Sequence, residues 1–442
     1  MDYKLAGLRR HRKTSTSLVP KQPAISLPME MEATLSQALW MLALPFSALV
    51  TLLLLGWTFY YDFTRTQIPP GISQGAKLRL MNLTMSLVLR LALILEKFGI
   101  CNKYVILRQL MDGIPPGRAP DLTIKEMLFE AVPVRVYWPR RAGAEPRRGL
   151  VWIHGGVGFF GSPRAYERFC RFIARESSTV VVCIRYPLAP EHPYPAQQLS
   201  CYAAVAHFLK NAGGYGVDPQ RVVLAGDSSG AAIVAAISQQ LVMRSDLPPA
   251  RGHVLLYPFL QALDFNLPSY QQNHSVPVLF KKRIIHLGML YLTGRNINVG
   301  EIMGNAHVPQ ELRAKYRKWI SAELIPEEFK LSAQEPFVPR PFSEDLYQAC
   351  KRAFEPTFSP LLAEDAILRQ FPETLLLTCE YDVFRDDGLL YKKRLEGNGV
   401  PVTWHHLKDG FHGTCLLTGL GPLEFPSTRK SMESIIQFLE RF

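Results

Sequence analysis

The chain has 442 residues, of which 48% are hydrophobic and 20% charged, so it can hold one large domain with additional elements or two domains. This composition excludes a disordered or fibrous protein. The net charge of +12 raises the question of nucleic acid, but the basic residues are dispersed among apolar segments, and we expect no nucleic-acid partner. A basic surface beside anionic lipid suits this charge better.

The seven cysteines predict no metal site. They form no CxxC pattern and no Cys/His cluster. Their number is odd, so at least one thiol is unpaired within the chain. Their spacing leaves any disulfide pairing and the redox compartment open.

The N-terminal region predicts a membrane anchor. Residues 1–34 are basic overall, and residues 35–61 carry no charge. A span of about 30 Å needs roughly 20 apolar residues, which this run supplies. Trp40, Trp57 and Tyr61 lie near its ends, where amphipathic aromatic side chains favour the interface. We expect an uncleaved, single-pass signal anchor at residues 35–61; the alternatives are a cleaved signal peptide or a buried core helix.

The sequence indicates the orientation of this anchor less clearly than its presence. The basic segment at residues 1–34 favours a cytosolic N-terminus, although Arg65, Lys77 and Arg79 follow the anchor. Two glycosylation sequons, at Asn82 and Asn273, are usable only in a lumenal or extracellular body. We therefore predict a type II protein with its main body in the lumen.

Residues 62–124 are predicted to form a helical N-terminal or cap region. Apolar positions recur at helical spacing over residues 78–100, with Arg90 and Glu96 among them. This pattern is typical of an amphipathic helix packed on the body or lying on the membrane. A second crossing is disfavoured by the internal charges.

Residues 125–442 show the alternation of an α/β domain. Short apolar runs bounded by Gly, Pro or Asp suit strands of a parallel sheet buried on both faces. These runs are GLVWI, TVVVCI, RVVLA, HVLLY, ETLLLTC and VTWHH. Amphipathic stretches, such as residues 203–210 and the small-residue run after Gly230, separate them. We expect a mostly parallel central sheet with helices on both faces.

The connection between residues 258 and 374 is too long for a bare loop. It contains two helix-like segments, at residues 281–292 and 314–324. We therefore predict a helical cap inserted at about residues 262–350, lying over the strand ends.

A serine nucleophile is predicted at Ser228. The segment from Gly226 to Gly230 matches G-x-S-x-G, follows a predicted strand and precedes a predicted helix. This is the strand–turn–helix that a nucleophile elbow requires. The flanking glycines admit close packing, and the seryl oxygen lies at a helix N-terminus, where developing negative charge is favoured. The alternative is an ordinary Gly/Ser turn.

An oxyanion hole is predicted at residues 154–157, which directly follow the strand LVWI. The backbone N–H groups of Gly156, Val157 and Ser229 would donate to a tetrahedral oxyanion, and Gly155 would shape the loop. His154 is expected to fix the loop rather than to carry protons.

The base and its orienting acid are predicted to be His412 and Asp382. Both follow predicted strands, and the order Ser, Asp, His is the one this type of fold uses. Rival acids are Asp386 and Asp387, which we expect to begin the next helix. Rival bases are His405 and His406, which continue a strand as packed or solvated residues.

From about residue 125 to the end, the chain resembles the hormone-sensitive-lipase-like branch of the α/β-hydrolases, above all the arylacetamide deacetylase-like proteins. The motifs that carry the resemblance are HGG, YPLAPEHPYPA, GDSSG, SPLL, DVFRDDG and DGFHG, in that order. It implies hydrolysis of carboxylic esters or amides, with Ser228, Asp382 and His412 as the triad and the HGG loop as oxyanion hole. It also implies an endoplasmic reticulum protein facing the lumen.

Two positions depart from the family pattern. Val157 stands where a third glycine is usual, and a β-branched residue disfavours the positive φ that such a loop can require. Pro187 stands where the family has Arg, which removes a guanidinium and a backbone donor near the loop.

The sequence thus predicts a membrane-anchored α/β-hydrolase that cleaves esters or amides, often apolar or lipid-like, through an acyl-enzyme on Ser228. No metal or organic cofactor is expected. A catalytically weak or inactive binding or receptor protein on the same fold, and a membrane-associated scaffold, are the alternatives. The exact substrate and the oligomeric state are left open.

Overall fold

A computed structural model describes residues 29–66, 68–140, 146–330 and 337–442. Most of the predicted basic segment lies outside the described residues. The chain divides into two units, Met1–Gly56 and Trp57–Phe442, and the second contains the whole sheet.

The apolar N-terminal run forms one helix, α1 (Met29–Arg65), which includes Pro45. The stretch Trp40–Arg65 is long and apolar enough to cross a membrane, and so is α2 (Gly75–Lys97). The large apolar side chains of α1 between Trp40 and Phe46 are exposed, which suits a lipid environment better than water. By length and composition alone, both helices qualify as spans, whereas the sequence favoured only the first.

Helix α2 belongs to the second unit and contacts its C-terminal part through the N-terminal end of the helix. Lys77 Nζ donates hydrogen bonds to the carbonyl oxygens of Pro422 (2.9 Å) and Glu424 (2.7 Å). Leu78 is fully buried. Helix α3 (Lys103–Asp112) packs beside α2. Thus α2 is at least partly a packed helix of the body, as its amphipathic pattern predicts.

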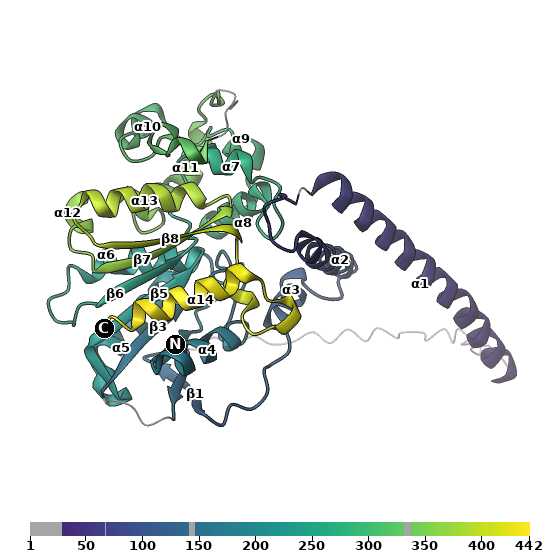
Figure 1. The fold of residues 1–442 in the computed structure, drawn as a ribbon. Helices are drawn as coiled ribbons and strands as arrows, with labels where there is room; N and C mark the ends of the chain where they lie inside the picture. Colours follow the sequence, from purple (N-terminus) through teal and green to yellow (C-terminus); the bar gives the residue numbers. More distant parts are fainter. Residues whose placement is uncertain (1–28, 67, 141–145, 331–336) are drawn as a thin grey trace, which may run out of the picture. The chain divides into compact units, whose positions relative to one another are not determined.

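The centre of the fold is an eight-stranded sheet in the order β1-β2-β4-β3-β5-β6-β7-β8 (Figure 1). Strand β2 runs antiparallel to β1 and β4, and the remaining neighbours are parallel. The strands are β1 (Leu122–Phe129), β2 (Val132–Pro139), β3 (Arg147–Ile153), β4 (Val180–Ile184), β5 (Val217–Asp227), β6 (Gly252–Leu256), β7 (Glu373–Tyr381) and β8 (Val402–Phe411).

Both faces of the sheet are covered, which explains the continuous apolar runs. Along β3, Val151 and Ile153 belong to one core cluster and Leu150 and Trp152 to another, and all four are fully buried. One face packs against α4 (Glu167–Ser177) and α14 (Pro426–Leu439). The other packs against α5 (Ala196–Asn211), α6 (Ser229–Leu241) and α13 (Arg385–Gly397). The predicted fold class is confirmed.

The antiparallel start of the sheet was not predicted. The first strand begins at Leu122, slightly before the predicted boundary at residue 125. Strand β1 is exposed at Lys125, Glu126 and Leu128, so it lacks the apolar run by which the inner strands were recognised.

The long connection between β6 and β7 contains six α-helices in its described residues, and Figure 1 shows α7, α9, α10 and α11 grouped together. Its α-helices are α7 (Pro268–Gln272), α8 (Lys281–Thr293), α9 (Val299–Met303), α10 (Gln310–Tyr316), α11 (Glu344–Cys350) and α12 (Asp365–Leu368). The segment at 281–292 is helical as expected. The segment at 314–324 is helical only at its ends, because the chain leaves α10 at Tyr316 and resumes as a short 3-10 helix at Ala322–Leu324.

The asparagines of both predicted glycosylation sites are buried in the folded chain. Asn82 is buried, and its amide nitrogen donates to Asp62 Oδ1. Asn273 is also buried, and its amide nitrogen donates to the carbonyl oxygens of Glu380 and Asp382, each at 3.0 Å. A glycan on either nitrogen would displace these hydrogen bonds, and glycosylation at the two sequons stays a prediction.

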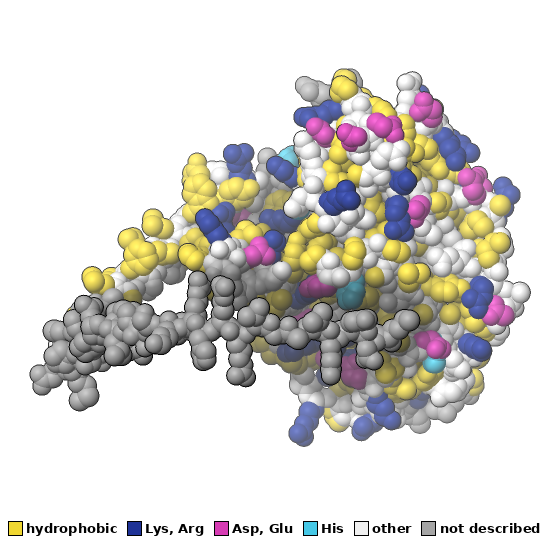
Figure 2. Space-filling view, turned by 180° about the vertical axis from the view of Figure 1, so that it is seen from behind, with side chains coloured by type: hydrophobic (Ala, Val, Ile, Leu, Met, Phe, Trp, Pro, Cys, Tyr) yellow, Lys and Arg dark blue, Asp and Glu magenta, His cyan; other side chains and the backbone are white. Residues whose placement is uncertain are grey.

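The basic side chains are dispersed over one face of the surface, and the cysteines are not paired in disulfides. On the face in Figure 2, Lys and Arg side chains lie singly among hydrophobic and other side chains, without one continuous basic patch. All seven cysteines lie in described residues and are free, and six of them are buried.

Candidate active site

Ser228 lies at a sharp turn between β5 and α6. Its backbone has φ 55° and ψ −124°, a strained conformation for a residue with a side chain. The flanking glycines permit this turn: a Cβ on Gly230 would lie 2.1 Å from the Ile153 carbonyl oxygen, and one on Gly226 would lie 2.7 Å from the Gly230 backbone. The strand–turn–helix geometry of a nucleophile elbow is therefore present.

Three side chains from distant parts of the sequence form one hydrogen-bonded chain. His412 Nε2 lies 2.9 Å from Ser228 Oγ, and His412 Nδ1 lies 2.7 Å from Asp382 Oδ2. A carboxylate accepts only, so Nδ1 carries the hydrogen and Nε2 is free to accept from the seryl hydroxyl. The other oxygen of Asp382 accepts from the Phe384 N–H at 2.9 Å, which holds the carboxylate in place.

The rival acids and bases are bound elsewhere. Asp386 accepts from the Ser269 N–H and contacts Arg385. Asp387 accepts from Leu260 N–H, Gln261 and Tyr270. Both lie in the first turn of α13, where the sequence placed them.

The two histidines of β8 are likewise occupied. His405 contacts Ser434, and His406 contacts Glu380 and Thr378. Neither histidine contacts Ser228.

The oxyanion loop contains a strained valine. Val157 has φ 58°, so the loop does require the positive φ that a β-branched residue disfavours. Its N–H donates to Ser229 Oγ at 2.9 Å, a contact the sequence did not predict. The Gly156 N–H has no acceptor among the described residues. The Ser229 N–H begins α6 and has no acceptor within that helix.

The N–H groups of Gly156 and Ser229 are therefore both without an acceptor among the described residues, as the predicted oxyanion hole requires. Val157 becomes a third donor only if the Ser229 hydroxyl rotates away.

His154 and Tyr186 fix the oxyanion loop through contacts with each other. The Tyr186 hydroxyl donates to the His154 carbonyl oxygen at 2.7 Å and lies 2.9 Å from His154 Nδ1. The two rings stack with centroids 4.1 Å apart. Burial lowers the pKa of His154 to about 4, so its imidazole is neutral at neutral pH. These contacts are those of a loop-fixing residue.

Asp227 joins the loop to the strand that carries Ser228. Its carboxylate accepts from the Gly155 N–H and from the Tyr166 hydroxyl, both at 2.8 Å. Burial raises the pKa of this carboxyl to about 6. Gly155 is thus tied to Asp227, which agrees with a shaping role for that residue.

Arg108 is a further residue that sequence reasoning missed. From α3 it donates to the carbonyl oxygens of Phe159 (2.9 Å) and Ala189 (2.6 Å). A guanidinium therefore does contact the loops beside Val157, although Pro187 supplies none. No local motif marks Arg108, whereas Asp227 and Tyr186 stand inside motifs that the sequence already singled out.

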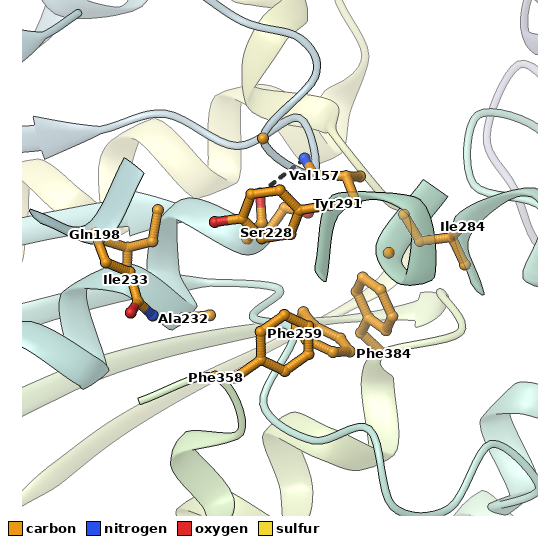
Figure 3. Close-up of a pocket in the computed structure, with 13 residues that line it drawn as sticks. Val157, Gln198, Ser228, Ala232, Ile233, Phe259, Ile284, Tyr291, Phe358 and Phe384 are labelled. Atoms are coloured by element: carbon orange, nitrogen blue, oxygen red, sulfur yellow. Dashed lines mark hydrogen bonds between the residues drawn. The ribbon is translucent and has the colours of Figure 1, made fainter. Parts of the chain in front are cut away.

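Two cavities are lined by Ser228. The larger, about 310 Å³, is lined by Ser228, His412 and Gly156 and by apolar residues of α2, α3 and α8. The smaller, about 50 Å³, is lined by Ser228, Ser229, Gln198 and mostly apolar side chains. Figure 3 shows the rings of Phe259, Phe358 and Phe384 gathered across this small pocket from Val157. Val157 and Ile284 line both cavities.

The fold and the geometry of this site are those of the α/β-hydrolase class. Comparison with protein families agrees: residues 150–304 and 326–416 match a family described as alpha/beta hydrolase fold. The chain is 41% identical to arylacetamide deacetylase-like 4 of Homo sapiens, over 87% of this chain and 94% of that protein. It is 39% identical to arylacetamide deacetylase of Mus musculus, over 74% and 83%.

The chain belongs to the α/β-hydrolase family, in the group of arylacetamide deacetylases and arylacetamide deacetylase-like proteins. The resemblance given by its motifs is confirmed. Among solved structures, similar folds include a bacterial heroin esterase (TM-score 0.55, 23% identity, 76% of this chain and 89% of that one). A thermostable esterase from Pseudomonas putida is also similar (TM-score 0.56, 21% identity, 84% and 98%).

Proposed function

We propose that the protein is a serine hydrolase that cleaves carboxylic esters or amides through an acyl-enzyme on Ser228. The observation that carries this proposal is the chain of hydrogen bonds from Ser228 through His412 to Asp382. His412 accepts the seryl proton as Oγ attacks the carbonyl carbon, and the imidazolium is stabilised by Asp382. The N–H groups of Gly156 and Ser229 receive the oxyanion.

The two cavities suggest which part of the substrate lies where. His412 must protonate the departing oxygen or nitrogen, so the leaving group lies on the side of its ring. His412 lines the larger cavity and not the smaller one. The leaving group therefore occupies the large cavity and the acyl group the small one.

The small cavity limits the acyl group. A water-sized group occupies about 10–15 Å³ of cavity volume. The small cavity of about 50 Å³ therefore admits roughly three to five non-hydrogen atoms. This size supports a deacetylase, as the names of the relatives do. The larger cavity and its apolar lining support an apolar or lipid-like leaving group.

The N-terminal helix supports a membrane location. We propose that α1 is a single-pass type II anchor, in keeping with the basic residues before it and with the family resemblance. We propose an endoplasmic reticulum location with a lumenal catalytic domain, which that resemblance supports. Protection of the catalytic domain from added protease in intact microsomes tests the orientation; digestion without detergent would contradict it.

A fluorophosphonate probe and a series of naphthyl esters test the activity. We expect the wild type to be labelled and Ser228→Ala not, and turnover to fall as the acyl chain lengthens from acetyl to octanoyl. Absent labelling, or a preference for octanoyl, would contradict the proposal.

A second candidate, a catalytically weak binding protein, is favoured by one observation. Val157 is strained and its N–H is already bonded to Ser229. Binding of an apolar ester without Ser228-dependent turnover would support this alternative.

A further inference from the structure

The outer wall of the large cavity is made by helices that precede the sheet in sequence. Met85, Leu89 and Leu93 recur every four residues along α2 and so form one stripe of the helix. Residues Leu107 and Met111 of α3 have the same spacing and line the same cavity. The part of the cavity wall that α2 and α3 supply is therefore helical and, apart from Lys103, mainly apolar.

The mouth of this cavity lies along α2. Met85 and Leu93 line the cavity and are also 38% and 44% exposed. Val278 is a third cavity-lining residue with substantial exposure, 46%. A mouth rimmed by exposed apolar side chains is unfavourable in water and marks a contact with an apolar phase.

Helix α2 lies beside the end of the proposed membrane anchor. Arg79 pairs with Asp62 at 2.7 Å, which joins α2 to the last turns of α1. The Arg90 guanidinium lies over the rings of Tyr61 (5.1 Å) and Trp57 (5.9 Å). Tyr and Trp at the end of an apolar helix favour the membrane–water interface, so the middle of α2 lies at that level.

A basic group stands at the same mouth. Arg283 of α8 lines the cavity and is exposed, although burial lowers the pKa of its guanidinium, and no hydrogen bond or ion pair of this group is seen among the described residues. It stacks over Phe280 at 5.0 Å. An exposed, unpaired guanidinium beside apolar side chains suits the phosphate level of a lipid surface.

We propose that the mouth along α2 rests on the bilayer and that the large cavity takes its substrate directly from the hydrocarbon phase. This inference rests on the proposed function and narrows its substrate class. The substrates are short-acyl esters of long-chain alcohols, dissolved in the membrane. The alcohol chain passes between α2 and α8, and the acyl carbonyl reaches Ser228.

Two esters distinguish entry of the substrate from the membrane from hydrolytic activity in general. One is hexadecyl acetate incorporated in phosphatidylcholine vesicles that contain the reconstituted full-length protein. The other is the water-soluble 4-nitrophenyl acetate, which has a small leaving group and does not need the hydrocarbon route. The measured quantity is the ratio of the two turnover rates for each variant.

Leu93→Lys and Met85→Lys place a charge at the mouth, where both side chains are already partly exposed and the fold has room. Each is expected to lower the ratio of vesicle ester to soluble ester roughly tenfold, because a cation in the path disfavours an apolar chain. The matched control is Leu91→Lys, on the same helix and 47% exposed but outside the cavity lining. We expect its ratio to stay close to that of the wild type.

An unchanged ratio in Leu93→Lys and Met85→Lys, or an equal fall in Leu91→Lys, overturns the route. A parallel loss of both activities in the milder Leu93→Gln, which introduces no charge at the mouth, also overturns it. If the wild type shows no Ser228-dependent turnover of either ester, it is the proposed function itself that fails.

Discussion

Ser229→Ala should make the protein a faster hydrolase. The Ser229 hydroxyl is the acceptor for the Val157 N–H at 2.9 Å, so this bond must break for Val157 to act as a third donor to the oxyanion. A neutral hydrogen bond contributes about 0.5–1.5 kcal/mol net, which corresponds to a roughly 2- to 13-fold rise in the acylation rate when the competing acceptor is removed. The Ser229 backbone N–H, itself a donor to the oxyanion, is retained.

The assay is the pre-steady-state release of 4-nitrophenol from 4-nitrophenyl acetate. Ser229→Thr keeps the hydroxyl and is the control, for which we expect no acceleration. If Ser229→Ala acylates no faster than the wild type while unfolding at the same temperature, the Val157 N–H takes no part in the reaction and the reasoning is refuted.

Three further predictions concern residues around the site. Asp382→Asn should lower kcat about 10⁴-fold, because an amide does not orient or stabilise the His412 imidazolium; a loss under tenfold in steady-state kinetics would argue against its role. Tyr186→Phe should cost about 1–3 kcal/mol of unfolding free energy in urea, since it leaves buried polar atoms of His154 without their partner; an unchanged midpoint contradicts this. Burial raises the pKa of Asp387 from 3.8 to about 8, so the folded protein keeps a proton that the unfolded chain loses. Stability should therefore fall between about pH 4 and 8, and Asp387→Asn should flatten that slope in thermal unfolding; equal slopes would show that another group is responsible.

The inner part of the fold was predictable because each segment carries its own signal. Buried parallel strands are apolar on both faces, and Gly226 and Gly230 are fixed by backbone contacts that admit no Cβ. The hydrogen bonds that join Ser228, Asp382 and His412 likewise agree with the order and local context of their motifs.

The edge of the fold was less predictable. Strand β1 is half exposed and held by pairing with β2, so its residues need not be apolar. Similarly, the segment after Tyr316 keeps a helical pattern of side chains but turns to pack Trp319 and Ile320 into the core.

Contacts between residues far apart in the chain could not be predicted from the sequence pattern. Asn82 belongs to a sequon, but its partner Asp62 lies on another helix, and nothing local shows that the amide is buried. The Val157 strain was anticipated from residue type, whereas the bond from its N–H to Ser229 depends on two loops meeting. Arg108 acts on the same loops from α3, with no motif of its own.

The most direct test of the account is capture of the covalent intermediate. Full-length protein is mixed with 4-nitrophenyl acetate, quenched in acid within the burst and digested for mass spectrometry. We predict one acetyl group on the peptide that contains Ser228, and none in the same peptide of Ser228→Ala. Turnover of the ester without acetylation of Ser228, or equal turnover by Ser228→Ala, would contradict the central claim.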